Sequence, residues 1–455
     1  MSAPVGGTGK GMKLHTKILL GLLLGGAAGL AVNLWLGSAH PFVAGVNTYL
    51  AQPVGQIFLN LLFMIVIPLV FASISLGVAG LGDLRVAGRV GGKAIGYFLV
   101  TTTLSATLGL VLVRTVNPGS GLSAAMRAEL LQTYAGDAAA KMQAAATGTF
   151  GIQTLVNVVT RNPVKSAVEL DLLGVIFFSL IFGAAITMIR EDRAKTMIAW
   201  LEALNDIVIK IVEIAMRIAP YGVAGLIFGV TSRFGLALLK PLGSYVLVVL
   251  AALIIHAVVT LGLIVRFAVG MSPIRFFGRI RASIVTAFST SSSSATLPTN
   301  IAVAEQNLGV PASVAGFVLP LGSTMCMNGT SLFEGITVLF LAEVFGVHLG
   351  LGQMVVVMIM TVITAVGAAG VPGGSIPLLV GVLAMFGIPA EGIAIILGVD
   401  RILDMSRTTV NVIGDMSAAA WVARSEGLWT AADVPSLEGL DVSGARLDET
   451  PAAAS

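Results

Sequence analysis

The chain has 455 residues, of which 56% are hydrophobic and 11% charged, and its formal net charge is +3. Its mean hydropathy is +0.96. Soluble domains carry about 25% charged residues, so this composition excludes a soluble domain and predicts an integral membrane protein. The apolar runs are long and lack the ten-residue alternation of outer-membrane strands, so we expect an all-α membrane fold.

Cysteine and histidine usage excludes two further classes of structure. Cys326 is the one cysteine, so the chain has no internal disulfide. The four histidines are scattered and do not have the spacing of metal ligands.

Six apolar segments are each close to or longer than the ~20 residues that a helix needs to cross a membrane. They are 14–36, 53–80, 93–116, 171–190, 197–230 and 239–269. No signal-peptide pattern precedes the first segment, so we expect the mature protein to retain it. Gly21, Gly25 and Gly29 give this segment a stripe of small residues, which predicts close packing against a neighbouring helix.

Lysine and arginine gather in alternate connections between these segments. The four clusters are Lys10, Lys13 and Lys17; Arg85, Arg89 and Lys93; Arg190, Arg193 and Lys195; and Arg275, Arg279 and Arg281. The positive-inside rule places the clusters and the N-terminus in the cytoplasm. Residues 117–170 then form a long extracellular insert, and the acidic segment 426–455 is expected to be a disordered cytoplasmic tail.

The second half of the chain contains two polar breaks between short apolar arms. Residues 283–300 are rich in serine and threonine, and residues 365–377 are rich in glycine. Irregular backbone at membrane depth is tolerated only where it lines a cavity or is buried in protein. Paired broken segments are typical of transporter binding sites, so these breaks predict a binding site between two related hairpin-and-helix units.

A third irregular stretch, 322–330, lies between the two breaks and has a glycine near each end. Two interpretations are open here. Unwound backbone carbonyls would ligate a hard cation such as sodium, or the stretch would be a helix kink in which serine and threonine bond back to the preceding turn.

Residues 400–415 place a dense polar stripe on an apolar helix. At about 100° per residue, Asp400, Asp404, Arg407, Thr408, Asn411 and Asp415 fall within roughly a 100° arc. Charged side chains at membrane depth normally face a cavity, a partner or a ligand. The stripe therefore predicts a surface that binds a charged, zwitterionic molecule; the alternative is a set of internal ion pairs among its own charged residues, including Arg401.

The residue types on this stripe suit an acidic amino acid. Arg407 offers a fork of donors that fits a carboxylate. Asp404 would accept a hydrogen bond from the ammonium group of an amino acid, or it would neutralise the charge of Arg407. The Asn411 amide could bind both the ammonium and the carboxylate of an amino acid. Backbone N–H groups of 291–294 and 371–375 would hold an anionic group at helix N-termini.

Four motifs together resemble one family. They are Ser-Ser-Ser-Ser-Ala-Thr-Leu-Pro at 291–298, Met-Asn-Gly-Thr at 327–330, Gly-Val-Pro-Gly-Gly at 370–374 and Asp-Met-Ser-Arg-Thr-Thr-Val-Asn-Val-Ile-Gly-Asp at 404–415. In this order they resemble the glutamate transporter homologues, the dicarboxylate/amino acid:cation symporters. The segment 64–73 also resembles this family, while the insert and the tail resemble it least.

The resemblance implies eight transmembrane helices, two re-entrant helical hairpins and a homotrimer whose protomers transport independently. It implies a scaffold from 1–92 and 171–238, and a mobile transport domain from 93–116 and 239–425 that slides against it as an elevator. The insert 117–170 and the tail 426–455 lie outside this division.

The resemblance also implies roles for individual residues. Arg407 would hold the side-chain carboxylate of the substrate, and Asp404 would accept its ammonium group. The full substrate set is Ser291, Ser292, Ser293, Thr330, Val371, Gly373, Gly374, Ser375, Asp404, Arg407, Thr408 and Asn411. One implied sodium site joins Asp415 to carbonyls of Gly322, Cys326 and Asn411; another uses carbonyls of Thr324, Ala365, Val366 and Ala368 near Met327.

The chain departs from the family pattern at three points. Asn328 stands where the family usually has an aspartate that ligates a further sodium with Thr101 and Thr102, and Phe98 stands where an aromatic hydroxyl is common. Coupling to fewer cations is therefore expected. Arg401 supplies an arginine that some members instead carry at the position of Ser291.

The leading hypothesis is sodium-coupled uptake of aspartate or glutamate across the cell inner (plasma) membrane, with N- and C-termini in the cytoplasm. One alternative is a symporter of C4-dicarboxylates or neutral amino acids, with protons as a possible coupling ion in place of sodium. The alternative from another class is a substrate-gated ion channel. No Walker loop, His-Glu-x-x-His or Gly-x-Ser-x-Gly motif is present, which argues against an enzyme or an ATP-driven pump. The expected partners are an acidic amino acid, the lipid bilayer and the other protomers of a homotrimer, and we expect no nucleic acid.

Overall fold

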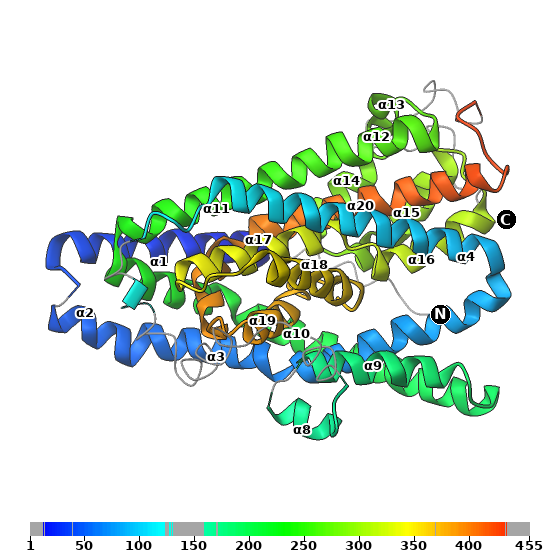
Figure 1. The fold of residues 1–455 in the computed structure, drawn as a ribbon. Coiled ribbons are helices and arrows are strands. Elements are labelled where there is room, and N and C mark those ends of the chain that lie inside the picture. The colour runs from blue at the N-terminus through cyan, green and yellow to red at the C-terminus, as the bar shows by residue number, and fades with distance from the viewer. Residues whose placement is uncertain are drawn as a thin grey trace, which may run out of the picture.

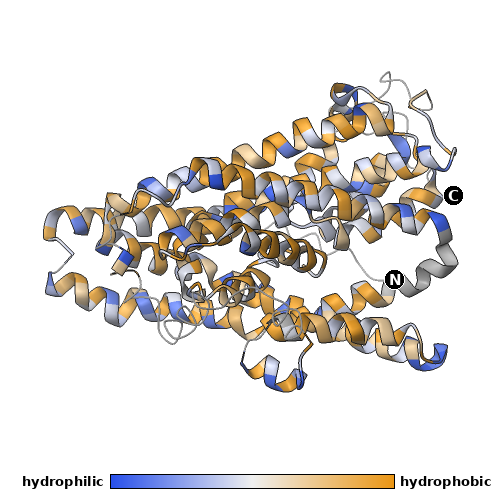
Figure 2. Cartoon of the chain, in the orientation of Figure 1, coloured by the Kyte–Doolittle hydropathy of each residue, from blue (hydrophilic) through white to orange (hydrophobic). Residues whose placement is uncertain are grey.

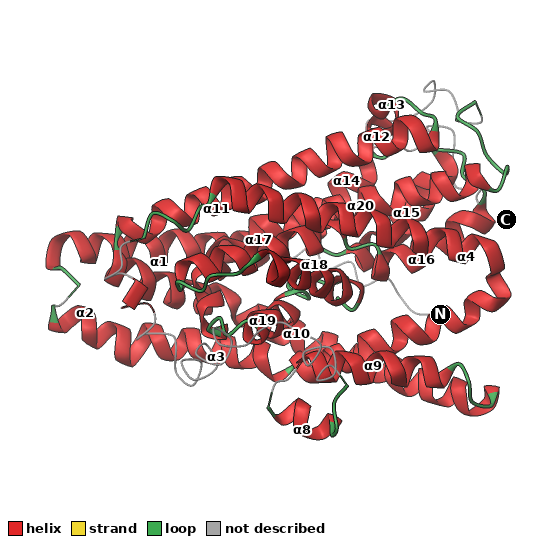
Figure 3. Cartoon of the chain, in the orientation of Figure 1, coloured by secondary structure: helices red, strands yellow, loops and turns green. Residues whose placement is uncertain are grey.

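The computed structural model describes residues 12, 14–38, 40–122, 127–128, 130, 159–169, 172–368, 370–432 and 434. Helices and their connections make up all of the described part of the chain (Figure 3). Six of these helical stretches are long and apolar enough to cross a membrane: Thr16–Leu36, Pro41–Ala79, Arg89–Val116, Glu191–Phe234, Leu236–Val269 and Ala312–Val344. The chain is therefore a multi-pass α-helical membrane protein, as its composition predicts.

The first half contains long helices that run along the molecule, among them α4 and α10, and several short ones (Figure 1). They are α1 (Leu14–Leu36), α2 (Pro41–Val46), η1 (Asn47–Ala51), α3 (Gln52–Met64), α4 (Val66–Val116), α8 (Pro163–Val168), α9 (Leu172–Ile186) and α10 (Glu191–Phe234). Helix α3 ends at Ile65 because Pro68 has no N–H to donate and its ring would crowd the carbonyl four residues earlier. Most of the expected insert 117–170 lies outside the described residues.

Helix α4 joins the ends of two expected spans. The sequence predicts separate spans over 53–80 and 93–116, whereas the backbone stays helical from Val66 to Val116. No proline lies between the two expected spans to stop the helix.

The second half consists of shorter, interrupted helices. They are α11 (Leu236–Ile255), η2 (His256–Leu261), α12 (Gly262–Ile264), η3 (Val265–Val269), α13 (Pro273–Arg279), α14 (Arg281–Thr290), α15 (Ser293–Gln306), α16 (Ala312–Met325), α17 (Asn328–Val344), α18 (Leu351–Val366), α19 (Ile376–Met385), η4 (Ala390–Ile393) and α20 (Ala394–Ser425). All three irregular stretches predicted from the sequence are breaks between helices.

Apolar residues predominate along the helices, and the helices differ in how deeply they are buried. Apolar residues cover most of the helices, and hydrophilic residues gather toward the ends of the bundle (Figure 2). Helix α17 is enclosed by protein, and the apolar window of Ala312–Val344 is 100% buried, against 17% for Thr16–Leu36. The core therefore lies around α17 and α20, and the glycine stripe of α1 packs against α10 as predicted.

The beginning of the expected disordered tail is ordered in the structure. Trp429 is 2% exposed, and its indole N–H donates to the Leu308 carbonyl oxygen at 2.8 Å. Glu426 forms ion pairs with Arg89 and Lys93, each at 2.6 Å. The buried ring of Trp429 and the paired carboxylate of Glu426 hold these residues against the bundle. The composition of the segment therefore placed the start of the disordered tail, at residue 426, too early. Residues 435–455 lie outside the described part.

Candidate functional site

Two helix breaks touch at the centre of the candidate site. One lies at Ser291–Ser292, between α14 and α15, and the other is the segment 367–375, between α18 and α19. The Ser292 hydroxyl donates to the Gly370 carbonyl oxygen at 2.5 Å, and the Ser294 N–H donates to the same oxygen at 3.1 Å. The Ser292 hydroxyl also accepts from a backbone N–H in the first turn of α15. The serine run therefore caps a helix and fastens the two breaks together.

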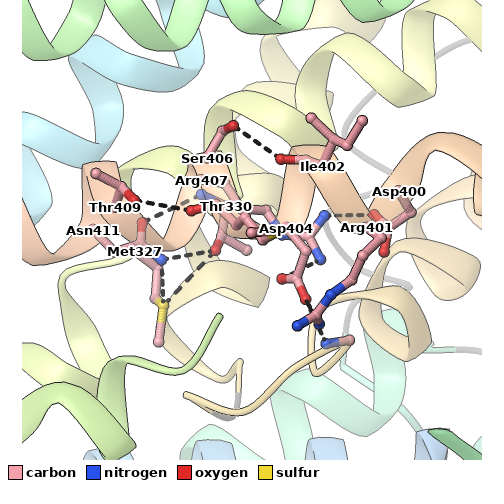
Figure 4. A network of polar contacts seen from close by, with 12 residues as sticks. Met327, Thr330, Asp400, Arg401, Ile402, Asp404, Ser406, Arg407, Thr409 and Asn411 are labelled. Carbon is pink, nitrogen blue, oxygen red and sulfur yellow. Dashed lines mark hydrogen bonds and ion pairs between the residues drawn. The ribbon is translucent and has the colours of Figure 1, made fainter. Parts of the chain in front are cut away.

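The polar stripe of α20 faces these breaks and is buried (Figure 4). Arg407 is 2% exposed; its Nη1 donates to Asp400 Oδ1 at 2.7 Å, and its Nη2 lies 2.9 Å from Asp404 Oδ1. The guanidinium lies 4.3 Å from the ring centroid of Phe333 in α17. Among the described residues Nη2 has no hydrogen-bond acceptor of good geometry, so this donor remains for a carboxylate ligand.

Asp404 is contacted from three sides. Besides Arg407, its Oδ2 accepts from the Gly373 N–H at 3.1 Å and lies 3.6 Å from Arg401 Nη1. Gly373 has a φ of +75°, a conformation that favours glycine, and this turns its N–H toward the carboxylate. The internal ion pairs that were the alternative to a binding surface are therefore present, together with the groups expected for binding.

A small cavity of about 20 Å³ lies between these elements, room for about one water molecule. It is lined by Ser291, Ser293, Met327, Thr330, Ala368, Gly370, Val371, Ser375, Asp404, Arg407, Thr408 and Asn411. Nine of the twelve residues expected to bind substrate are in this lining. Ser292, Gly373 and Gly374 are not; the first two hold the walls through the hydrogen bonds described above.

Two hydroxyl groups of the lining are buried without a hydrogen-bond partner in the described structure, those of Ser291 and Ser375. Ser291 ends α14 with a φ of 53°, which a non-glycine residue rarely adopts. Buried hydroxyls normally find a partner, so both groups are suited to bind a polar ligand.

The Asn411 side chain has a structural role that the sequence did not reveal. Its Oδ1 accepts from the Gly329 N–H at 2.7 Å, and its Nδ2 donates to the Thr330 hydroxyl at 3.1 Å. Gly329 lies in the first turn of α17, where backbone N–H groups have no partner within the helix. Asn411 therefore caps the restarted helix while its side chain also faces the cavity.

Asp415 is the clearest sign of a cation site. It is 0% exposed, and within the described structure neither carboxylate oxygen has a hydrogen-bond partner. An added Cβ on Gly322 would lie 2.6 Å from Asp415 Oδ1, so the absence of a side chain there lets the carboxylate approach the backbone of α16. The break after Met325 frees the Cys326 carbonyl from the helix. The Gly322 carbonyl oxygen accepts from the Cys326 N–H at 2.8 Å, so the Cys326 carbonyl is the more open of the two. A buried carboxylate beside such a carbonyl suits a hard cation.

The other expected cation ligands are less open. The Thr324 side chain is exposed, and the Ala365 carbonyl oxygen already accepts from the Ala368 N–H at 3.0 Å. Met327 and Ala368 line the cavity, and Val366 is half-buried at the end of α18. Within the described ranges, no group of three His, Cys, Asp or Glu side chains could hold a metal ion. A cation here would depend on Asp415 and backbone oxygens.

The family departure at Asn328 has a visible local effect. Its Oδ1 accepts from the Thr102 hydroxyl at 2.8 Å, and its carbonyl accepts from the Ser105 hydroxyl at 2.7 Å. The Thr101 hydroxyl instead donates to the Tyr97 carbonyl oxygen at 2.9 Å. A neutral amide thus takes a hydrogen bond where a charged ligand was expected, which favours fewer cation sites.

Sequence reasoning did not assign two acidic residues of the site. Asp400 was placed on the stripe and included in the alternative of internal ion pairs, but it was given no role in the site; in the structure it is the closest carboxylate to Arg407, at 2.7 Å. Glu334 in α17 is 0% exposed and accepts from the Thr364 hydroxyl at 2.7 Å. A lone acid in an apolar run at membrane depth was the available signal.

Comparison with known proteins agrees with this geometry. Residues 14–425 match the family described as "Sodium:dicarboxylate symporter family". The chain is 36% identical over 421 residues to the proton/sodium-glutamate symport protein of Bacillus subtilis, covering 92% of this chain and 94% of that protein. It is 34% identical to the proton/glutamate-aspartate symporter of Escherichia coli, covering 83% and 85% respectively.

A relative with a different named substrate matches to a similar degree. The C4-dicarboxylate transport protein of Bacillus subtilis is 34% identical over 391 residues, which cover 86% of this chain and 91% of that protein. With the family match spanning both halves of the fold and the whole candidate site, the chain belongs to the sodium:dicarboxylate symporter family, a family of transporters and not of enzymes.

Proposed function

We propose that this protein accumulates aspartate or glutamate by coupling their uptake to sodium. The observation that supports this most is the small cavity where Arg407, Asp404 and two hydroxyls without a hydrogen-bond partner in the described structure meet. In this proposal Arg407 Nη2 binds the side-chain carboxylate, and Asp404 accepts the ammonium group. The hydroxyls of Ser291 and Ser375, with N–H groups of the two breaks, hold the α-carboxylate.

The cavity of about 20 Å³ must enlarge to take an amino acid. Residues 370–375 are the candidate gate. Among the described residues, the Gly370 carbonyl accepts two hydrogen bonds from the serine run, and the Gly373 N–H donates one to Asp404; opening would break these bonds. An incoming ammonium group would compete for Asp404 and an incoming carboxylate for Arg407. Substrate binding would thus replace ion pairs within the protein by ion pairs between the protein and the substrate.

Sodium is the proposed coupling ion because Asp415 is buried, its carboxylate oxygens accept no hydrogen bond of good geometry in the described structure, and it lies beside Gly322. The carbonyls of Gly322, Cys326 and Asn411 complete this first proposed site, and the carbonyls of Thr324, Ala365, Val366 and Ala368 form the second. The sodium carried through the first site would neutralise Asp415 during transport.

Proton coupling is the second candidate, and Glu334 favours it. This carboxyl group is enclosed in α17 with a single hydroxyl partner, so a bound proton would neutralise it at little cost. The names of the relatives include both ions. A substrate-gated ion channel remains the alternative from another class.

The proposal includes the family architecture: eight transmembrane helices, two re-entrant hairpins (α14–α15 and α18–α19) and a homotrimer. The scaffold would comprise 1–92 and 171–238, and the sliding transport domain 93–116 and 239–425. The positive clusters favour cytoplasmic termini in the plasma membrane. The close packing of α1 against α10 supports a rigid scaffold.

Uptake into proteoliposomes with separately imposed sodium and proton gradients tests the proposal. The panel is aspartate, glutamate, succinate and serine. We expect saturable accumulation of aspartate or glutamate driven by the sodium gradient. Accumulation driven by the proton gradient alone would favour coupling through Glu334, and flux that never exceeds equilibrium would favour a channel.

A further inference from the structure

A second cavity lies at the other end of α17 from the proposed binding site. Its volume is about 420 Å³, within the range of pockets that bind small molecules. Its walls include the end of α4 and the turn after it, the end of α17, the connection to α18 and the first turn of α18. It shares no lining residue with the proposed binding site. At about 1.5 Å per residue along α17, Ala342 in this cavity lies about 18 Å from Thr330 in the other.

The cavity lies where two membrane-spanning stretches end. Arg114 stands close to the end of Arg89–Val116, and Glu343 stands close to the end of Ala312–Val344. The positive clusters of the sequence predict that these ends face the outside of the cell. A cavity at this depth is within reach both of membrane lipids and of solutes in the outer compartment.

Close packing of the chain builds the walls of this cavity. Asn117 ends α4 with a φ of 53°, and the turn that follows lies directly on α17. An added Cβ on Gly119 would lie 2.6 Å from Glu343 Cβ, so a side chain there would overlap α17. The stem of Arg127 lies over the α17–α18 connection, where its Cδ would be 3.9 Å from a Cβ added to Gly346. The segment after α4 is therefore fitted to the end of α17.

Two arginines give the cavity a positive charge. Glu343 is the one acidic residue of the lining, and both Arg114 and Arg127 lie close enough to act on it through their charge. One oxygen of Glu343 already accepts from the Gly119 N–H at 2.9 Å. In the described structure the Arg127 Nε is buried and has no hydrogen-bond partner. A buried donor of this kind favours a ligand that accepts from it, and a guanidinium fits a carboxylate or a phosphate.

Much of the remaining lining is apolar. The apolar residues are Leu339, Ala342, Val347, Leu349 and Met354. An inorganic anion would pair with the arginines but would leave this apolar wall unused. A ligand that also buries apolar surface gains about 25 cal/mol for each Å² removed from water. The two kinds of wall together therefore favour an organic anion.

We propose that this cavity binds an organic anion, whose carboxylate or phosphate pairs with Arg114 and Arg127 and whose apolar part lies against the apolar residues of the lining. The ligand is either an anionic lipid of the surrounding membrane or a soluble organic anion of the outer compartment. The bound anion would join the segment after α4 to the α17–α18 connection. This inference does not rest on the proposed function, because the two cavities are separate.

The first experiment uses the unaltered full chain in phosphatidylcholine nanodiscs. The probe is decanoate that carries a photoactivatable diazirine on its chain, and peptide mass spectrometry locates the labelled residues. We expect saturable labelling within residues 339–354, with competition by decanoate. Decanol, which has the same chain without the charge, should compete at least about tenfold more weakly, because hydrogen bonds to charged groups contribute about 1.5–3 kcal/mol. Equal competition by decanol, or no saturable labelling of this segment, would overturn the proposal.

Substitution of the arginines tests their part in binding. The double variant Arg114→Gln, Arg127→Gln should bind the probe about tenfold more weakly or worse, since the ligand loses both charged donors. Arg161→Gln is the matched control, because Arg161 is an exposed arginine of the same connection 117–170 but does not line the cavity. Unchanged labelling of the folded double variant, or an equal loss in Arg161→Gln, would overturn the proposal. If the double variant does not fold, the comparison of decanoate with decanol on the unaltered protein decides.

A third experiment distinguishes the two sources of the ligand once probe binding is established. The protein is released from nanodiscs of mixed phosphatidylcholine and phosphatidylglycerol, and native mass spectrometry counts the lipids that stay bound. Phosphatidylglycerol that is retained by the unaltered protein and lost in the double variant would identify an anionic lipid as the ligand. Equal retention by the two proteins would identify a soluble organic anion.

Discussion

The helix pairs α1–α10 and α17–α20 pack through different kinds of contact. Helices α1 and α10 meet through Gly21, Gly25 and Gly29, whose missing side chains let the backbones approach. Helices α17 and α20 meet through buried polar groups, among them Asn411 capping α17 and Arg407 over Phe333. The first pair depends on shape, and the second depends on satisfied charges and hydrogen bonds.

The two regions also differ in how many buried side-chain polar atoms lack a hydrogen-bond partner. In the described part of the chain, Asn47 and Arg127 are the sole residues before residue 256 with a buried side-chain polar atom that lacks a hydrogen bond. The others lie further along, and they include Arg407 and Asp415. Unpartnered buried polar groups cost free energy unless something else binds them. The α17–α20 region is therefore where ligands are expected, and the α1–α10 pair is where rigidity is expected.

The largest effect should come from Arg407→Ala. Removing a charge that pairs with Asp400 and Asp404 should lower aspartate uptake by about a hundredfold or more, because truncating one partner of a buried pair costs about 2–5 kcal/mol. Uptake in proteoliposomes measures this, with size-exclusion chromatography to verify folding. Normal uptake by the folded variant would mean that Arg407 does not bind the substrate and that its ion pairs with Asp400 and Asp404 are structural.

Asp415→Asn should act on the cation and not on the amino acid. An amide keeps the shape of the side chain but loses the negative charge, so we expect the sodium concentration for half-maximal uptake to rise by about tenfold. Titration of aspartate uptake with sodium measures this, and Asp192→Asn, in an exposed ion pair at the start of α10, is the matched control. An unchanged sodium titration would remove Asp415 from the cation site.

Much of this region could be predicted because charges in an apolar chain are conspicuous. The spacing of Asp404, Arg407 and Asn411 placed them on one face, and glycine and serine runs located all three helix breaks. The sequence left open whether Arg407 pairs with Asp400 or binds a ligand, because partner choice depends on side-chain conformation in three dimensions. The same holds for Trp429, a single aromatic residue whose burial depends on a distant carbonyl.

The α1–α10 pair should respond to volume instead of charge. An added Cβ on Gly25 would overlap the backbone of Ala224, whereas one on Gly26 would have Ile227 Cγ1 as its nearest neighbour at 3.7 Å. Gly25→Ala should therefore lower stability by about 1–3 kcal/mol, as overpacking typically does, and Gly26→Ala should be neutral. Thermal unfolding in detergent compares the two, and equal melting temperatures would contradict tight packing of this pair.

The smallest effect should come from Glu426, just beyond α20. Hydrogen bonds from Arg89 and Lys93 lower the pKa of Glu426. A lowered pKa means that the contact stabilises the protein at pH values above the usual glutamate pKa of about 4.3 and is lost as the pH falls through the lowered value. Glu426→Gln should reduce the Tm by about 1–2 °C at pH 7. This difference should vanish in acid, when Glu426 is protonated in the unaltered protein as well. Glu191→Gln, which removes an exposed pair with Lys195, is the control and should have a smaller effect. A Tm difference that persists unchanged in acid would show that Glu426 acts through packing, as Gly25 does, and not through its charge.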